Sequence, residues 1–112
     1  MEIKPTITYA DFEKLDMRVG SIVSVEPVQD SKKLLRLMVN FNDFERQVLA
    51  GIAKDYPDHT QLVGRQAIFI VNLEPRIIAG TESQAMILVA VESEQAAVLE
   101  PARPLASGST VH

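Results

Sequence analysis

The sequence predicts a mainly β domain, a five-stranded OB-fold barrel with a short N-terminal helix, a second short helix between the third and fourth strands, and a C-terminal extension. Three observations favour this fold class. Residues 35–41 alternate between apolar and polar side chains, as a half-buried strand does. Residues 67–71 and 85–91 are short apolar runs with the β-branched content of buried strands. The segment 51–64 is too long for a hairpin and has room for a short helix. An SH3-like barrel is the alternative.

A short helix is predicted at the start of the chain. Thr8 is a suitable N-cap residue, and Asp11 follows three positions later, as in a capping box. The apolar residues Tyr9, Phe12 and Leu15 follow at helical spacing. We expect this helix to end near Asp16.

The first strand is predicted from Met17 to Pro27. Apolar residues at odd-numbered positions, which lie on the same face of a strand, indicate its buried side. They are Met17, Val19, Val23 and Val25, and we refer to this pattern as a single parity. Gly20 favours a bend or a bulge in a long, curved strand. Pro27 ends the strand or marks its edge, since proline has no N–H for a sheet ladder.

The second and third strands are predicted at residues 35–41 and 44–50, joined through Asn42 and Asp43. A two-residue turn at this point would place Arg46 on the apolar face beside Val39. We therefore expect a longer loop or a bulge that shifts the register.

The fourth and fifth strands are predicted at residues 67–71 and 85–91, and a polar connector, residues 72–84, joins them. Pro75 lacks the N–H that a central strand needs, and Gly80 permits a turn. The connector is therefore expected at the rim of the barrel, where polar groups held by rigid strands commonly recognise a ligand.

The composition predicts one domain over residues 1–112, with its core at about 16–91 and an extension over 92–112 that has too little apolar surface for another strand-rich unit. The chain has 112 residues, 46% of them hydrophobic, and no cysteine. Lack of cysteine excludes disulfide scaffolds and thiolate metal sites. The start carries no secretory pattern, and the longest apolar run falls far short of the about 20 residues that cross a bilayer. We expect a soluble cytoplasmic protein that does not bind a membrane.

Charge and motifs exclude several function classes. The net charge of −4 argues against non-specific coating of nucleic acid, which requires dense positive charge. No P-loop, dinucleotide fingerprint or Ser-His-Asp order is present, and His59 has no second histidine near it. The sequence therefore predicts neither catalysis nor a metal or other cofactor.

Several short motifs occur in an order that resembles the tRNA-binding domain family, and the resemblance covers nearly the whole chain. The motifs are Asp16-Met17-Arg18-Val19-Gly20-Ser21-Ile22, Ser31-Lys32-Lys33-Leu34, Ala50-Gly51-Ile52, Gly64-Arg65 and Asn72-Leu73-Glu74-Pro75-Arg76. This family includes dimeric bacterial tRNA-binding proteins, the C-terminal domain of bacterial methionyl-tRNA synthetase and CsaA-type export chaperones. The resemblance implies an OB-fold and a homodimer completed by the C-terminal extension.

The resemblance also implies which residues face RNA. The implied RNA-binding residues are Lys33, Asn72, Arg76, Ser83 and Met86, and Lys32 and Arg36 join them as members of the densest cationic group. Lysine and arginine contact phosphates, asparagine and serine hydrogen-bond to base edges or the 2′-hydroxyl, and methionine packs against an exposed base. Ordinary structural roles are the alternatives. The cations would form a solvated strand edge, Glu74 and Arg76 would form an ion pair, Met86 would pack in the core, and Ser83 would cap a strand end.

Three partners are compatible with the sequence. The first is tRNA, bound by shape through a non-catalytic homodimer. The second is an unfolded or pre-export polypeptide, bound as a CsaA-like chaperone would bind it, which the apolar Ile77, Ile78 and Ala79 after Arg76 favour. The third is an aminoacyl-tRNA synthetase to which this chain would attach as an accessory subunit.

Overall fold

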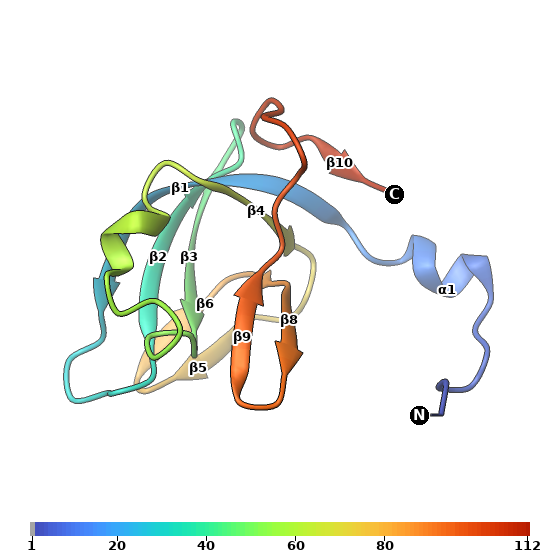
Figure 1. Ribbon diagram of the computed structural model, residues 1–112. Coiled ribbons are helices and arrows are strands. Elements are labelled where there is room, and N and C mark those ends of the chain that lie inside the picture. Colours follow the sequence, from blue (N-terminus) through green and yellow to red (C-terminus); the bar gives the residue numbers. More distant parts are fainter. Residues whose placement is uncertain (1) are drawn as a thin grey trace.

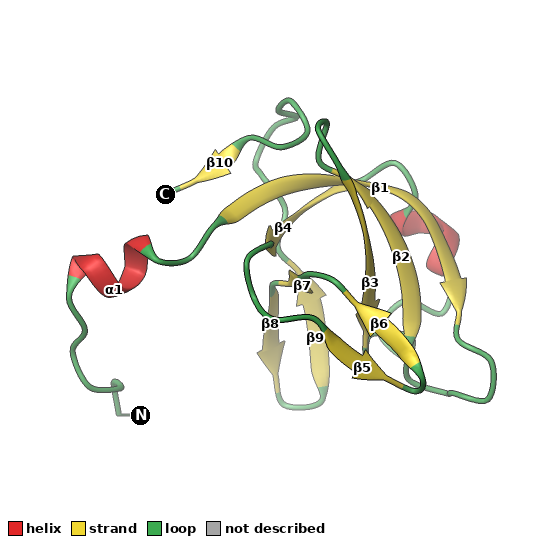
Figure 2. Ribbon diagram, turned by 180° about the vertical axis from the view of Figure 1, so that it is seen from behind, coloured by secondary structure: helices red, strands yellow, loops and turns green. Residues whose placement is uncertain are grey.

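A computed structural model describes residues 2–112 and confirms the predicted mainly β barrel of OB type. Antiparallel strands curl around one core, and a short helix projects from the barrel (Figures 1 and 2). The elements are α1 (Tyr9–Glu13), β1 (Met17–Pro27), β2 (Leu35–Asn40), β3 (Glu45–Ala50), the 3₁₀ helix η1 (His59–Leu62), β4 (Gln66–Ile70), β5 (Arg76–Ile78), β6 (Thr81–Ser83), β7 (Met86–Ile87), β8 (Val89–Glu92), β9 (Gln95–Val98) and β10 (Thr110–Val111). The barrel strands follow the order β3-β2-β1-β4-β7, and β10 pairs with β1.

The long strand β1 is curved and shared between two neighbours. Its residues 17–21 pair with β4, and its residues 21–27 pair with β2. The register shifts between Ile22 and Ser24 and not at Gly20. This bulge turns Val23 outward, 51% exposed, and buries Ile22, so the predicted single parity was wrong at the bulge but holds at Val19 and Val25, which are buried.

Gly20 serves close packing instead. A Cβ atom at this position would lie 2.5 Å from Val39 Cγ1 and 2.7 Å from Phe41 Cε1. Because real Cβ atoms do not approach other atoms so closely, glycine allows β1 to lie directly over the core side chains of β2.

The alternation predicted for β2 is confirmed, but the turn into β3 differs from expectation. Val39 lies directly opposite Arg46, and Phe41 N–H donates to the Phe44 carbonyl at 2.9 Å. The connection is therefore the two-residue turn that we expected the chain to avoid, with Asn42 at φ 79°. No register shift is needed, because the Arg46 guanidinium finds backbone carbonyl partners at the end of the barrel.

The second apolar run, residues 85–91, forms two short strands and not one buried strand. β7 pairs with β4, and after Leu88 the chain leaves the barrel as β8, which pairs with β9. Val91 is 68% exposed as a result. The strands β5, β6, β9 and β10 were not predicted, since each is only two to four residues long and is formed by pairing with a partner strand.

The barrel interior holds the hydrophobic core. The largest fully buried side chains are Phe41, Phe69, Ile22, Leu35, Leu37, Leu62, Val19, Val39 and Val48. The Phe41 ring stacks on Phe44 with centroids 5.1 Å apart and meets Phe69 edge-on at 5.4 Å. These aromatic contacts join strands β2 and β4 across the interior.

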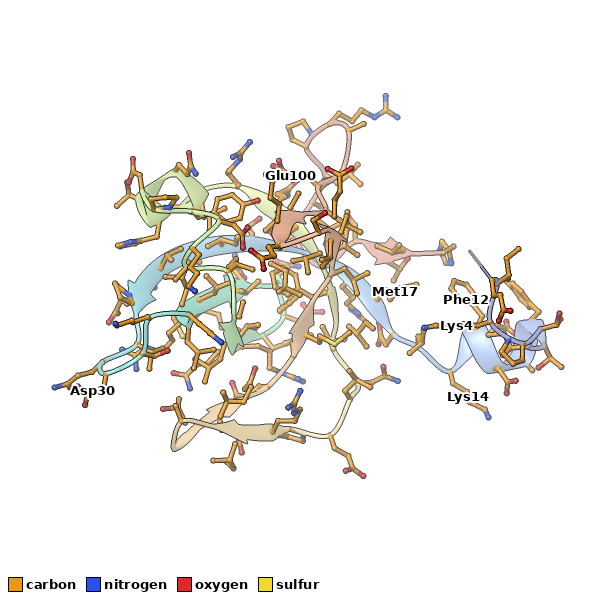
Figure 3. All side chains as sticks on the ribbon, turned by 60° about the horizontal axis from the view of Figure 1, so that its bottom comes forward. Lys4, Phe12, Lys14, Met17, Asp30 and Glu100 are labelled. Atoms are coloured by element: carbon orange, nitrogen blue, oxygen red, sulfur yellow. The ribbon has the colours of Figure 1, made fainter. Side chains whose placement is uncertain are left out.

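The N-terminal arm, residues 2–15, lies outside this core. The predicted capping box is present: the Thr8 hydroxyl accepts from Asp11 N–H, and the Asp11 carboxylate accepts from Thr8 N–H. The helix ends at Glu13, earlier than expected, and none of its residues is buried. Figure 3 shows Lys4, Phe12 and Lys14 on this arm, at the opposite end of the molecule from Asp30.

Candidate functional site

The connector between β4 and β7 folds into a hairpin at the rim of the barrel. Strands β5 and β6 pair from Arg76 opposite Ser83 to Ile78 opposite Thr81. Ala79 and Gly80 form the turn with φ values of 51° and 77°. Positive φ at both central residues matches the right-handed twist of the two strands, which is why a two-residue turn occurs here.

This hairpin is joined to β3 largely by side chains. Gln84 N–H donates to the Gln47 carbonyl at 2.8 Å, and Gln47 N–H donates to the Gln84 side-chain oxygen at 2.9 Å. The Gln47 side-chain amide then donates to the Glu82 carbonyl at 2.9 Å. Side-chain amide groups thus make several of the hydrogen bonds at the β3 edge that backbone groups would make in a regular ladder.

Ser83 belongs to the same junction. Its hydroxyl accepts from Leu49 N–H at 3.0 Å and donates to the Ala85 carbonyl at 3.2 Å. The residue is only 7% exposed. In this arrangement the Ser83 hydroxyl holds the hairpin against β3, beneath the surface on which Arg76 lies.

Arg46, which sequence reasoning did not select, holds both ends of the connector. Its guanidinium donates to the Gln84 carbonyl at 2.8 Å and to the Val71 carbonyl at 3.1 Å. It also lies over the Phe44 ring, 4.8 Å from the centroid. The sequence did contain one signal for Arg46: a two-residue turn at Asn42 and Asp43 would place this arginine on the apolar face of the strand.

We expect Arg46→Met to lower the free energy of unfolding by about 1–3 kcal/mol, because two carbonyls lose a charged donor. Urea unfolding followed by circular dichroism measures the change. Arg65→Met is the matched control: it removes an exposed ion pair to Glu100 of 3.2 Å, typically worth under about 1 kcal/mol. Equal decreases in the free energy of unfolding for the two variants would contradict the assigned role of Arg46.

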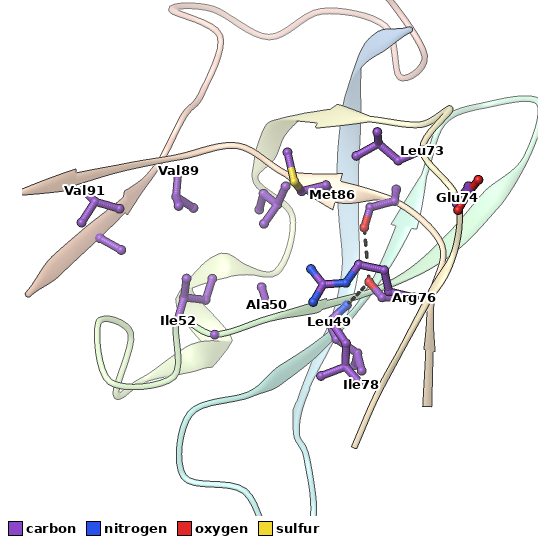
Figure 4. A pocket seen from close by; sticks show the side chains of 15 residues that line it. Leu49, Ala50, Ile52, Leu73, Glu74, Arg76, Ile78, Met86, Val89 and Val91 are labelled. Carbon is purple, nitrogen blue, oxygen red and sulfur yellow. Dashed lines mark hydrogen bonds between the residues drawn. The ribbon is translucent and has the colours of Figure 1, made fainter. Parts of the chain in front are cut away.

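An apolar pocket of about 640 Å³ lies between the hairpin, β3 and the strands β7 to β9. The lining residues are Leu49, Ala50, Gly51, Ile52, Leu73, Glu74, Arg76, Ile78, Ser83, Ala85, Met86, Ile87, Val89, Val91 and Ala96. Figure 4 shows the Arg76 side chain extending into this pocket and Glu74 at its edge. Met86 is 43% exposed and lines the wall. The pocket therefore combines apolar walls with one guanidinium, that of Arg76, and one carboxylate at its edge, that of Glu74.

Several cations are already paired with carboxylates. The ion pairs are Lys14–Asp11 at 3.3 Å, Arg18–Asp16 at 2.9 Å, Arg36–Glu26 at 2.8 Å and Arg65–Glu100 at 3.2 Å. The hydrogen bonds and the charge of Asp16 raise the pKa of Arg18 above its ordinary value. Arg36 lies directly across the sheet from the lining residue Leu49, so its paired guanidinium is close to the pocket.

Other cations lie in the pocket lining or on the segments next to the lining residue Ile52, and they form no ion pair within residues 2–112. They are Lys32, Lys33, Lys54 and Arg76. The Lys33 carbonyl accepts from Ala53 N–H at 3.0 Å, which holds the β1–β2 loop beside the segment that follows the lining residue Ile52. Arg76 is therefore an unpaired cation in the pocket lining, and no ion pair joins it to Glu74.

Asn72 lies at a different surface from Arg76. Its side-chain oxygen accepts from Asp16 N–H at 2.8 Å, and its amide donates to the Lys14 carbonyl at 2.7 Å. It lines a second cavity, between the N-terminal arm and β10. Arg76 and Met86 thus line one pocket, and Lys32, Lys33 and Arg36 lie on elements that are hydrogen-bonded to segments of its lining or next to it. Asn72 instead holds the junction between the arm and β1.

The chain is thus a small OB-type barrel with an apolar pocket that contains one cation unpaired within the described residues, Arg76. Residues 2–112 contain neither a cluster of three or more metal-binding side chains nor a helix long and apolar enough to span a membrane. Residues 17–110 match the tRNA binding domain family. The chain belongs to this family.

Relatives in sequence include two methionine–tRNA ligases. The ligase of Archaeoglobus fulgidus is 39% identical over 111 residues, which cover 99% of this chain and 17% of the ligase. The ligase of Chlorobium chlorochromatii is 46% identical over 94 residues, which cover 84% of this chain and 13% of the ligase. The chain therefore spans less than a fifth of the length of these two relatives.

Two solved structures share the complete fold. The MetRS-related protein of Pyrococcus horikoshii superposes with a TM-score of 0.88 at 33% identity, with 100% of both chains covered. The chaperone CsaA of Bacillus anthracis superposes with a TM-score of 0.87 at 28% identity, covering 96% of this chain and 100% of CsaA.

Proposed function

We propose that this chain is a non-catalytic tRNA-docking module that acts as a cytoplasmic homodimer. The observation that carries the proposal is the family match over residues 17–110 together with the unpaired Arg76 in the lining of an apolar pocket. Lys32, Lys33 and Lys54, on the segments next to the lining residue Ile52, add unpaired charge. Lysines hold phosphates as point charges, and the rigid barrel presents them at fixed spacing. Docking of this kind selects a folded RNA by its shape.

Few phosphate contacts are available to one protomer, since the chain has a net charge of −4 and several cations are already paired. Binding by one barrel is therefore modest and sensitive to salt. A two-fold dimer presents the same site twice, so one large RNA gains from the effective concentration of the second site.

Exposed apolar residues support the proposed dimer. Ile3, Ile7 and Tyr9 on the N-terminal arm are 97%, 65% and 69% exposed, and Leu99 and Leu105 in the C-terminal extension are 40% and 46% exposed. Apolar side chains projecting from a folded core are typical of a surface that a second protein covers. We assign the arm and the extension to the subunit interface.

Titration with tRNA at two salt concentrations tests the docking function. We expect affinity to fall steeply between 50 and 200 mM salt, with Lys32→Ala and Lys33→Ala each reducing the slope of log K against log salt by about 0.7–0.9. Arg103→Ala is the control, because Arg103 is an exposed cation that lines a separate cavity. Slopes that are equal for wild type and all three variants would contradict the assignment of this surface.

Polypeptide binding is the second candidate function, and the apolar walls of the pocket together with the similarity to CsaA favour it. Apolar binding persists or strengthens as salt rises, whereas RNA docking weakens. The same titration with an unfolded polypeptide therefore separates the two functions. Tight, salt-resistant polypeptide binding without tRNA binding would support the chaperone function.

Attachment to an aminoacyl-tRNA synthetase is a further proposal, supported by the similarity to segments of methionine–tRNA ligases. In that arrangement the chain would supply tRNA affinity and the synthetase the chemistry. Co-purification with methionyl-tRNA synthetase is the expected result.

A further inference from the structure

The apolar pocket contains no aromatic side chain among its lining residues. Phe41 and Phe69 are in the core, Phe44 and Tyr56 pack against the core, and Tyr9 and Phe12 are on the N-terminal arm. Proteins hold unstacked bases on flat groups, either aromatic rings or guanidinium planes. In this pocket, the guanidinium of Arg76 is the flat cationic group.

Arg76 is free to play that role. It is exposed, it makes no ion pair within the described residues, and its side chain reaches into the pocket from β5 (Figure 4). Arg46, in contrast, uses its guanidinium on two backbone carbonyls. A guanidinium is weakly hydrated and planar, so it stacks face to face on flat rings, whereas an ammonium group has no flat face and is attracted to a ring only through its charge.

We propose that the pocket binds one unstacked nucleobase of the docked RNA, with the Arg76 guanidinium stacked on the base. Met86 and Ile78 supply the apolar wall, and the neighbouring phosphates lie outside, toward Lys32 and Lys33. This inference rests on the proposed function and assigns Arg76 to base stacking and not to a phosphate contact.

Physical chemistry favours a base over the other occupants of such a pocket. A phosphate would lose its hydration against apolar walls that offer few donors, at a large cost in free energy. An apolar peptide side chain would leave the guanidinium partly desolvated without a partner. A nucleobase has apolar faces that fit the walls and a π system that attracts the cation, and its own phosphates remain at the cationic rim.

The first test compares Arg76→Lys with Arg76→Ala in tRNA affinity. A phosphate contact survives in Arg76→Lys, since the charge is retained, whereas a stacking contact is lost in both variants. We expect both to weaken binding about five- to a hundredfold, the range for one stacked base. Lys33→Arg is the matched control for a phosphate contact and is expected to retain wild-type affinity.

The second test removes the bases and keeps the phosphates. Heptauridylate and a fully abasic heptamer compete with labelled tRNA for the wild-type protein and for Arg76→Ala. We expect heptauridylate to compete at least about fivefold better for the wild type. For Arg76→Ala we expect the ratio between the two competition constants to fall below about half of its wild-type value.

The outcomes separate this inference from the proposed function. If tRNA binds but Arg76→Lys equals the wild type, or if both heptamers compete equally for the wild type, base stacking is wrong and tRNA docking stands. If neither tRNA nor heptauridylate binds at low salt, the proposed function is wrong, and the base site with it.

Discussion

Replacement of Phe41 by alanine is expected to lower the free energy of unfolding by about 3–5 kcal/mol, the usual cost of deleting a buried phenylalanine ring. Phe41 is 0% exposed and touches aromatic rings on two sides, those of Phe44 and Phe69. Its removal leaves a cavity between the rings of Phe44 and Phe69 in the barrel interior. A domain stabilised by about 5–15 kcal/mol loses a large share of its stability in this way.

Urea unfolding at 25 °C, followed by circular dichroism, measures this loss. Val23→Ala is the control, because Val23 is 51% exposed at the bulge of β1 and is expected to change stability by less than about 0.5 kcal/mol. A cost below about 1 kcal/mol for Phe41→Ala would show that the core does not depend on this ring.

Two charges on the N-terminal arm are expected to separate the proposed dimer and to weaken tRNA binding about 10²- to 10⁴-fold. The variant is Ile7→Asp with Tyr9→Asp. Both residues are exposed and none in α1 is buried, so the charges do not disturb the barrel core. The loss of affinity follows from the loss of the second binding site, since each protomer keeps its own pocket and cations.

Sedimentation velocity and tRNA titration measure the two effects on the same samples. The wild type is expected at twice the chain mass of 12.4 kDa and the variant at that mass. Val23→Asp, a charge on an exposed residue of β1, is the control and is expected to remain a dimer. A wild-type protein that sediments at the mass of one chain would remove the dimer from the proposed function.

Local sequence patterns predicted the elements that depend on near neighbours. The capping box of Thr8 and Asp11, the alternation of β2 and the turn at Gly80 were all read correctly, because hydrogen bonds or side-chain periodicity within a few residues fix them. The order of short motifs predicted the family, which the match over residues 17–110 confirms.

Errors arose where distant residues meet. Arg46 faces the apolar side of β3 without a register shift because Val71 and Gln84, far away in the sequence, supply carbonyl partners. The run 85–91 divides after Leu88 because the C-terminal extension returns to pair with its second half. Neither partner is visible in a short sequence window.

The sequence by itself determined the barrel class, the family and the residue types that suit a docking surface, since periodicity, turn chemistry and motif order are local properties. Only the tertiary structure decided which of those residues form hydrogen bonds within the fold and which remain unpaired at the surface. It buries Ser83 in the junction with β3, uses Asn72 to hold the arm and leaves Arg76 unpaired in an apolar pocket. The physical reason is that the partners of these side chains, such as Leu49, Asp16 and Lys14, lie far away in the sequence, so only folding decides which hydrogen-bonding groups are satisfied within the protein.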